Sequence, residues 1–111
     1  MDKPGFVDDR HFTEYVETVK QLKRDGQYSR AEELLIRLVD ATEAESLVDG
    51  LGVAPWYYEQ LAIIYSKMNN SESELAILER YERQRKAPGA SPPKLAQRLR
   101  KLRERKNDQS E

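Results

Sequence analysis

The stretch "GVAPWYYEQLAIIYSK", residues 52–67, holds three consecutive aromatic residues, a third of the nine in this 111-residue chain, at the start of a helix that its spacing predicts. Pro55 suits the first turn of a helix, where its missing N–H leaves no backbone bond unmade. Further on, apolar side chains recur every three or four residues, which places them on one helix face. That face consists of Tyr58, Leu61, Ala62, Tyr65 and Met68. Trp56 lies off this face, and its role is the main functional question that the sequence raises.

The same spacing predicts two helices before this stretch. The first covers about residues 12–25, with Asp8 or Asp9 as its N-cap and Gly26 as its stop. The second begins near Ser29 and runs to about Leu47, because nothing before Gly50 breaks it. No part of the chain shows the alternating pattern of a half-buried strand. The sequence therefore predicts an all-α fold.

Two further helices follow. Ser71 with Glu74 three residues later is a capping box, which predicts the start of a fourth helix. After the break "APGASPP", Ser91 as N-cap and Pro92 open a fifth helix, in which Leu95, Leu99 and Leu102 recur at helical spacing. Residues 107–111 are expected to form a disordered tail. The chain thus has about five helices.

Composition limits the class of protein. Hydrophobic residues make up 38% of the chain and charged residues 35%, which suits one small, well-solvated domain. The absence of cysteine excludes disulfides, thiolate metal sites and cysteine nucleophiles, and favours a reducing compartment. The polar N-terminus does not resemble a secretory signal, and no run approaches the roughly 20 apolar residues of a membrane span. We expect a cytoplasmic protein without membrane contact.

The charges are distributed unevenly. Residues 1–82 hold nine Lys/Arg against seventeen Asp/Glu, whereas residues 83–106 hold ten Lys/Arg against Glu104 alone. On the predicted fifth helix, one stripe at helical spacing consists of Lys94, Arg98, Lys101 and Arg105. Such a stripe suits binding to phosphates or to a partner protein. It equally suits a helix whose leucines pack on its own domain while its cations meet the acidic remainder.

The segment "GQYSRAEELL" resembles the centre of a tetratricopeptide repeat (TPR), with glycine at the turn, tyrosine two residues later and alanine early in the second helix. These residues are Gly26, Tyr28 and Ala31 here, and Tyr15 falls where the family carries its large aromatic residue. Leu22 takes the place of the later tyrosine. This unit lacks the Leu-Gly pair of the family.

A second unit matches the other half of the motif. In "YYEQLAIIY", Tyr58 takes the aromatic place, Leu61-Ala62 resembles the Leu-Gly pair, and Tyr65 is the later tyrosine. Asn69 stands at the turn, where it can adopt the left-handed conformation of glycine. Pro88 lies near the proline that commonly ends a repeat, whereas Glu74 replaces the small alanine. Gly26 and Asn69 lie 43 residues apart, against a usual period of about 34.

The resemblance implies a TPR-like, right-handed array of antiparallel helix hairpins. Residues 1–88 would form the repeat domain, with units at about 12–45 and 55–88, and residues 89–106 a basic capping helix of the same domain. In such arrays the first helices of the units line a groove that binds peptides. The residues that the resemblance assigns to this partner-binding groove are Val16, Lys20, Lys23, Arg24, Trp56, Glu59, Ile63 and Lys67.

Three roles for Trp56 remain open at this stage: an anchor in an open groove, a residue covered by the protein's own fifth helix, or part of a self-association surface. Trp and Arg are enriched among residues that dominate binding interfaces, which favours a partner segment with one apolar side chain and nearby acidic groups.

The sequence contains no arrangement typical of catalysis. His11 is the single histidine and has no neighbouring cysteine, and there is no phosphate-binding loop or nucleophile motif. We therefore expect no catalytic residue, cofactor or metal ion, and a non-enzymatic adaptor that binds another protein or peptide. The alternatives are a nucleic-acid-associated regulator that uses the basic helix and a homodimeric helical scaffold.

Overall fold

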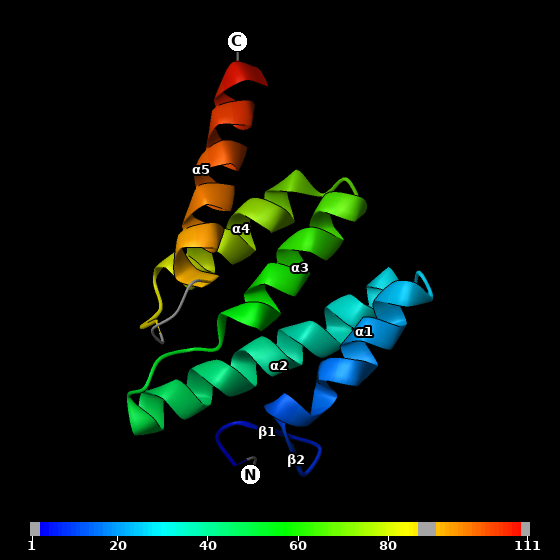
Figure 1. Ribbon diagram of the computed structural model, residues 1–111, viewed down its shortest axis with the longest axis vertical. Helices are drawn as coiled ribbons and strands as arrows, with labels where there is room; N and C mark the ends of the chain where they lie inside the picture. Colours follow the sequence, from blue (N-terminus) through cyan, green and yellow to red (C-terminus); the bar gives the residue numbers. More distant parts are fainter. Residues whose placement is uncertain (1–2, 87–90, 110–111) are drawn as a thin grey trace.

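Helices carry most of the chain in the computed structural model, which describes residues 3–86 and 91–109 (Figure 1). The five α-helices of these residues are α1 (Val16–Arg24), α2 (Tyr28–Asp49), α3 (Pro55–Lys67), α4 (Ser71–Glu82) and α5 (Ser91–Gln109). Two-residue strands β1 (Phe6–Val7) and β2 (Arg10–His11) and a 3₁₀ helix (Phe12–Tyr15) precede them. The prediction of an all-α fold with about five helices is confirmed.

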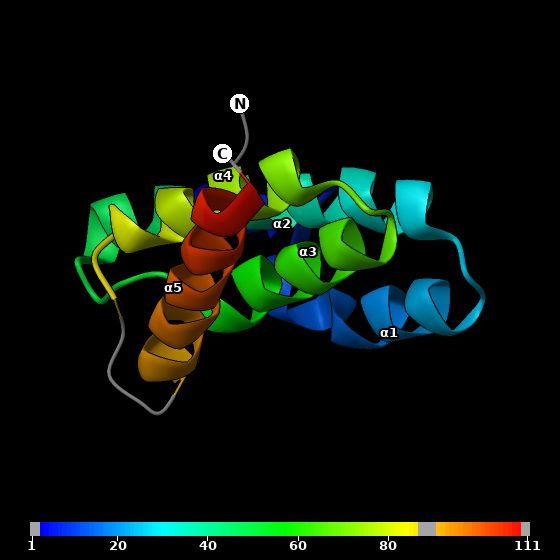
Figure 2. The same cartoon turned by 90° about the horizontal axis from the view of Figure 1, so that it is seen from above.

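The helices lie in two layers. Each helix packs against the next along the chain, and α5 also packs against α3. Seen from above, α1 and α3 form one layer and α2 and α4 the other, and α5 runs obliquely from the level of α1 to that of α4 (Figure 2). The first helices of the two hairpins therefore share one side of the molecule.

The turns that end α1 and α3 are built alike. At the first, Gly26 has φ +70° and the Gln27 N–H donates to the Leu22 carbonyl at 2.9 Å. At the second, Asn69 has φ +57° and the Asn70 N–H donates to the Tyr65 carbonyl at 2.8 Å. These six-to-one hydrogen bonds close a helix end around a left-handed residue. The turn predicted for Asn69 is confirmed, and the two turns recur 43 residues apart.

The core follows the same offset. Tyr15 and Tyr58, Leu35 and Leu78, and Leu38 and Tyr81 are pairs of positions 43 residues apart, and all six residues are buried. Tyr65 is buried as predicted, whereas Tyr28 is half-buried. Tyr57 is 3% exposed and donates its hydroxyl hydrogen to the Phe12 carbonyl at 3.1 Å.

The start of the chain corrects one prediction. Asp8 and Asp9 do not cap a helix; with φ of +48° and +66° they form the two-residue turn of the β1–β2 hairpin. Two consecutive positive φ angles match the twist of the hairpin strands, and aspartate tolerates this conformation better than most residues. His11 caps the 3₁₀ helix instead, in a capping box with Glu14.

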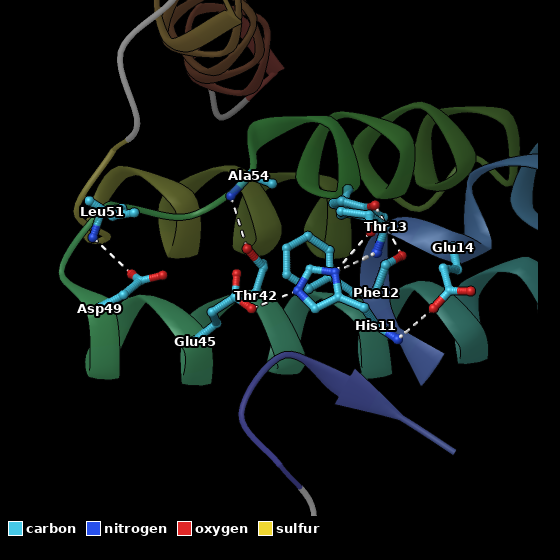
Figure 3. A network of polar contacts seen from close by, with 10 residues as sticks. His11, Phe12, Thr13, Glu14, Thr42, Glu45, Asp49, Leu51 and Ala54 are labelled. Carbon is cyan, nitrogen blue, oxygen red and sulfur yellow. Dashed lines mark hydrogen bonds and ion pairs between the residues drawn. The ribbon is translucent and has the colours of Figure 1, made fainter. Parts of the chain in front are cut away.

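Two short networks hold the hairpin and the start of α3 against α2 (Figure 3). The His11 Nε2 atom lies 2.6 Å from the Glu45 Oε2 atom. Three residues before Glu45 in α2, the buried Thr42 hydroxyl accepts a hydrogen bond from the Ala54 N–H at 3.0 Å. Because Ala54 is the N-cap of α3, this bond fixes where α3 begins and hence where Trp56 lies.

The start of α4 differs from the prediction. Asn70, not Ser71, is its N-cap, and the Asn70 side chain accepts from the Ser73 N–H at 3.1 Å. Glu74 does not fold back to complete a capping box, because its carboxylate is buried against Arg98 of α5 at 3.1 Å. Helix α2 begins at Tyr28 and ends at Asp49, and α5 continues to Gln109, past the predicted start of the tail. Pro88, residues 110–111 and the side chains of Ser91 and Pro92 lie outside the described residues.

Alkaline pH should destabilise this core. Burial raises the pKa of Tyr57 to about 12 and raises the pKa values of Tyr58, Tyr65 and Tyr81 above the ordinary value. As the pH rises, these tyrosines therefore lose their protons at a lower pH in the unfolded chain than in the folded protein. Their contribution to the free energy of unfolding is fully present below about pH 10 and is lost as the pH rises through the folded pKa values. Each tyrosine protonated only in the folded state lowers the free energy of unfolding by about 1.4 kcal/mol per pH unit.

We therefore expect the urea midpoint, followed by far-UV circular dichroism, to fall steeply above about pH 10. A midpoint that stays constant throughout the alkaline range would contradict the burial of these hydroxyls.

Candidate functional site

One side of α3 is left uncovered by the core. Trp56, Glu59 and Ile63 are half-buried, and Ser66 and Lys67 are exposed, whereas every other residue from Tyr57 to Tyr65 is buried. At 100° per residue, these five side chains fall within an arc of about 100° on the helix. The structure thus brings together the α3 residues that the resemblance assigns to a groove.

Trp56 is held firmly at the start of this side. Its ring meets the ring of Tyr57 edge to face, with 5.0 Å between centroids, and it packs against the core cluster. Tyr57 is itself buried, so the indole rests on a fixed support while part of it stays exposed. An aromatic side chain in such a position offers contact area to a partner at low entropic cost.

Helix α1 continues this surface. The Lys23 ammonium donates a hydrogen bond to the side-chain oxygen of Gln60, whose side chain is buried beside the uncovered side of α3. Partial burial lowers the pKa of Lys23 below its usual value, the nearby positive charge of Lys67 lowers it further, and Glu59 opposes both. The two cations therefore lie close enough to repel each other.

The remaining α1 residues of the predicted groove flank Lys23. Val16 is half-buried and packs against the core, whereas Lys20 and Arg24 are exposed. Lys20 forms a loose pair with Glu17, at 3.8 Å, and the Arg24 guanidinium donates to the Gln21 side chain at 2.8 Å. Such exposed contacts within one helix contribute little to stability, so both cations remain available to a ligand.

The basic stripe of α5 meets this surface at Ser66. A hollow of about 530 Å³ is lined by Ser66, Glu74, Arg98, Lys101, Glu104 and Arg105. A neighbouring hollow of about 270 Å³ shares Ser66, Glu74 and Arg105 and adds Asn69, Asn70, Ser71, Leu102 and Lys106. We call these two together the α5 hollow. Lys94, the first residue of the predicted stripe, does not line it.

The predicted groove and the basic stripe, treated as rivals in the sequence, are therefore parts of one surface. We call it the α1–α3–α5 face. Its members are Val16, Lys20, Lys23, Arg24, Trp56, Glu59, Ile63, Ser66, Lys67, Arg98, Lys101 and Arg105.

Helix α5 is also anchored by its own domain. Leu95, Leu99 and Leu102 are buried, and the Arg103 guanidinium pairs with Glu79 at 3.0 Å and Glu82 at 3.2 Å. Arg98 pairs with the buried Glu74. Two cations of the helix are thus neutralised internally, whereas Lys101 and Arg105 have no hydrogen bond or ion pair with any described residue.

The Arg98–Glu74 pair should respond unequally to truncation. The side chain of Glu74 is 4% exposed and that of Arg98 is 34% exposed. Arg98→Ala leaves a buried carboxylate without its partner, so we expect it to lower the free energy of unfolding by about 2–3 kcal/mol. Glu74→Ala leaves a cation that water can reach, and we expect a loss of about 1 kcal/mol. Urea unfolding of both variants measures the difference, and equal losses would contradict this account of the pair.

Two residues of this site carried little signal in the sequence. Glu74 falls at helical spacing with Leu78 and Tyr81, so a polar residue there indicates a buried polar partner, whereas Gln60 lies off the apolar face predicted for its helix. The spacing does not say which partner, because Lys23 and Arg98 come from distant parts of the chain.

Comparison with known proteins does not assign the chain to a family. No protein-family model matches it, and no curated protein or solved structure shows significant similarity to it. Among the helices described, none is long and apolar enough to cross a membrane. Within residues 3–86 and 91–109, no three His, Asp or Glu side chains gather into a group that could hold a metal ion.

Proposed function

We propose that this chain is a cytoplasmic, non-enzymatic adaptor that binds a segment of another protein on the α1–α3–α5 face. The observation that supports this most strongly is the continuity of that face, in which partly exposed apolar side chains are bordered by cations from three helices. Trp56 and Ile63 would take an apolar side chain of the partner. Lys20, Lys23, Arg24 and Lys67 would favour acidic groups beside it.

The architecture supports a TPR-like repeat as the basis of this function. The two helix hairpins end their first helices with matching turns, and their buried positions recur at the same offset. The first helices of the two hairpins, α1 and α3, lie in one layer (Figure 2), and α5 packs against α3. In a repeat of this kind the first helices line the binding groove, with α5 in the place of a capping helix.

The charges favour a protein partner over nucleic acid. Glu59 and Glu104 lie within or beside the face, where they would repel a phosphate backbone but can accept hydrogen bonds from peptide N–H groups. Arg98 and Arg103 are already paired with carboxylates of α4. A nucleic-acid-associated regulator that uses the remaining cations of α5 is the second candidate, because Lys101 and Arg105 have no described partner.

A capture experiment tests the adaptor proposal. Immobilised wild-type protein and the variants Trp56→Ala, Lys67→Glu and Leu51→Ala would be exposed to nuclease-treated cell lysate, and retained proteins identified by mass spectrometry. Truncating a central tryptophan of an interface typically costs 2 kcal/mol or more. We therefore expect a set of proteins retained by wild type and by Leu51→Ala but lost with Trp56→Ala and Lys67→Glu.

Leu51 is the matched control, since it is a large apolar side chain, 71% exposed, on a different part of the molecule. Far-UV circular dichroism would first establish that each variant keeps its helices. A retained set that does not change with Trp56→Ala contradicts the proposal. Capture that requires intact nucleic acid favours the second candidate, and a doubled mass in light scattering favours a homodimeric scaffold.

A further inference from the structure

The α5 hollow is a concave surface that the partner-binding residues on α1 and α3 do not themselves explain. It lies between the end of α3, the start of α4 and the second half of α5, and its two parts measure about 530 and 270 Å³. Ser66 belongs both to the uncovered side of α3 and to the lining of the hollow. A ligand on α3 can therefore extend into the hollow without leaving the surface.

The hollow is cationic at its rim. Within it, the buried Glu74 carboxylate neutralises Arg98, with which it pairs at 3.1 Å. Lys101 and Arg105 line the hollow and have no hydrogen bond or ion pair with a described residue. Glu104 offsets one of these charges. The balance leaves a local excess of positive charge around a space that can hold a side chain.

We propose that the α5 hollow binds an acidic side chain or terminal carboxylate of the same protein segment whose apolar side chain contacts Trp56. Lys101 and Arg105 would hold the carboxylate. This inference rests on the proposed function and adds the chemistry of the partner: an acidic segment with one apolar anchor.

The geometry of α3 sets the distance between the two groups. Trp56 and Ser66 are ten positions apart on one helix, which corresponds to about 15 Å at 1.5 Å per residue. An extended chain covers about 3.3 Å per residue, so the anchor and the carboxylate should be about five residues apart in the bound segment. An acidic residue closer to the anchor would instead meet Lys23, which donates a hydrogen bond to Gln60, four residues after Trp56.

An acidic protein segment fits this surface better than a phosphate polymer. Nucleic acid presents a charge at every nucleotide and gains affinity from a long run of cations. Here a short cationic stretch is followed along α3 by Ile63 and Glu59, which have no hydrogen-bond donor for phosphate, and then by Trp56. A single carboxylate followed by an apolar side chain matches that order.

A peptide selection tests the inference. A phage-displayed library of random peptides of about twelve residues would be selected on the wild-type protein, and the enriched peptides synthesised with a fluorescent label. We expect enriched peptides to combine an apolar residue with Asp or Glu about five positions away. Fluorescence anisotropy would then measure their affinities for wild type and variants.

The decisive variant is Lys101→Glu with Arg105→Glu, for which we expect affinity to fall at least about tenfold, as for loss of a charge-assisted contact. The matched control is Arg83→Glu with Arg100→Glu, two exposed cations outside the α5 hollow with the same change in charge, for which we expect less than about a twofold change. Replacing the acidic residue of the peptide by its amide should reproduce the loss without altering the protein.

Each outcome separates the inference from the function on which it rests. Peptides that depend on Trp56 but contain no acidic residue at this spacing, or bind the Lys101→Glu, Arg105→Glu variant as tightly as wild type, overturn the inference and leave the adaptor proposal standing. Failure to select any peptide that depends on Trp56 overturns both. A labelled oligonucleotide whose binding is lost in that variant, while peptide affinity is unchanged, would assign the hollow to phosphate and also overturn the inference.

Discussion

Tyr58→Ala should lower the free energy of unfolding by about 3–5 kcal/mol, the range found for removal of a buried aromatic side chain. Tyr58 is completely buried, and its ring lies 5.0 Å from that of Tyr81, which belongs to α4. Its hydroxyl donates to the Glu43 carboxylate of α2 at 2.7 Å. Since this one side chain links three helices, its removal leaves a cavity between them and a Glu43 carboxylate oxygen without its hydrogen-bond donor. Urea unfolding followed by circular dichroism measures the loss.

Tyr58→Phe is the control for this prediction, because it keeps the ring and removes only the hydroxyl. We expect it to cost about 1–2 kcal/mol, the usual value of a buried hydrogen bond to a charged group. If the alanine and phenylalanine variants lose the same stability, packing of the ring does not hold α2, α3 and α4 together as the structure indicates.

Glu43→Ala should be the next most damaging change, with a loss of about 2–4 kcal/mol. Two nitrogens of the Arg80 guanidinium donate hydrogen bonds to the Glu43 carboxylate at 2.8 and 2.7 Å, and these bonds link α4 to α2 within their layer. The Glu43 side chain is 18% exposed, so water compensates only partly for its removal. The same change leaves the buried hydroxyl of Tyr58 without its acceptor.

Asp40→Ala is the matched control, because Asp40 also accepts from Arg80, at 2.7 Å, yet its side chain is 62% exposed. We expect it to cost less than about 1 kcal/mol, as exposed pairs usually do. Thermal and urea unfolding of both variants would measure the difference. Equal losses would mean that burial of Glu43 does not determine the strength of this network.

The sequence was sufficient to predict the helices and their turns. Pro55 marks the start of α3, and leucine spacing identifies the buried side of α5. Gly26 was predicted as the residue that ends the first helix and Asn69 as a turn residue able to adopt a left-handed conformation, and both have positive φ. Local preferences determine such features, and a single sequence displays them.

Features that depend on distant contacts could not be predicted in the same way. Glu74 has the spacing of a capping box with Ser71, but tertiary packing buries it against Arg98, 24 residues later. Asp8 and Asp9 suit an N-cap and equally suit the hairpin turn that they form. In both cases a local rule allowed two outcomes and long-range packing selected one.

The candidate site likewise combines features that the sequence predicted with features that depend on distant contacts. The resemblance to a TPR was enough to group Trp56, Glu59, Ile63 and Lys67 on one side of α3. It could not show that α5 packs beside α3 so that Ser66 lines a hollow with Lys101 and Arg105. The tilt of α5 against its neighbours (Figure 1) follows from packing of side chains on three helices, which no single pattern contains.

The most direct test of the α1–α3–α5 face is a methyl NMR titration of the protein with a peptide selected on it. Val16 and Ile63 report on the face, whereas Leu47, Val48 and Leu51 report on an exposed aliphatic tip at the end of α2, where they are 89%, 73% and 71% exposed. We predict that bound peptide shifts the Val16 and Ile63 methyl signals and the Trp56 indole N–H signal, and leaves the signals of the tip unchanged. Shifts confined to Leu47, Val48 and Leu51 would place binding at this tip, outside the α1–α3–α5 face, and contradict the account.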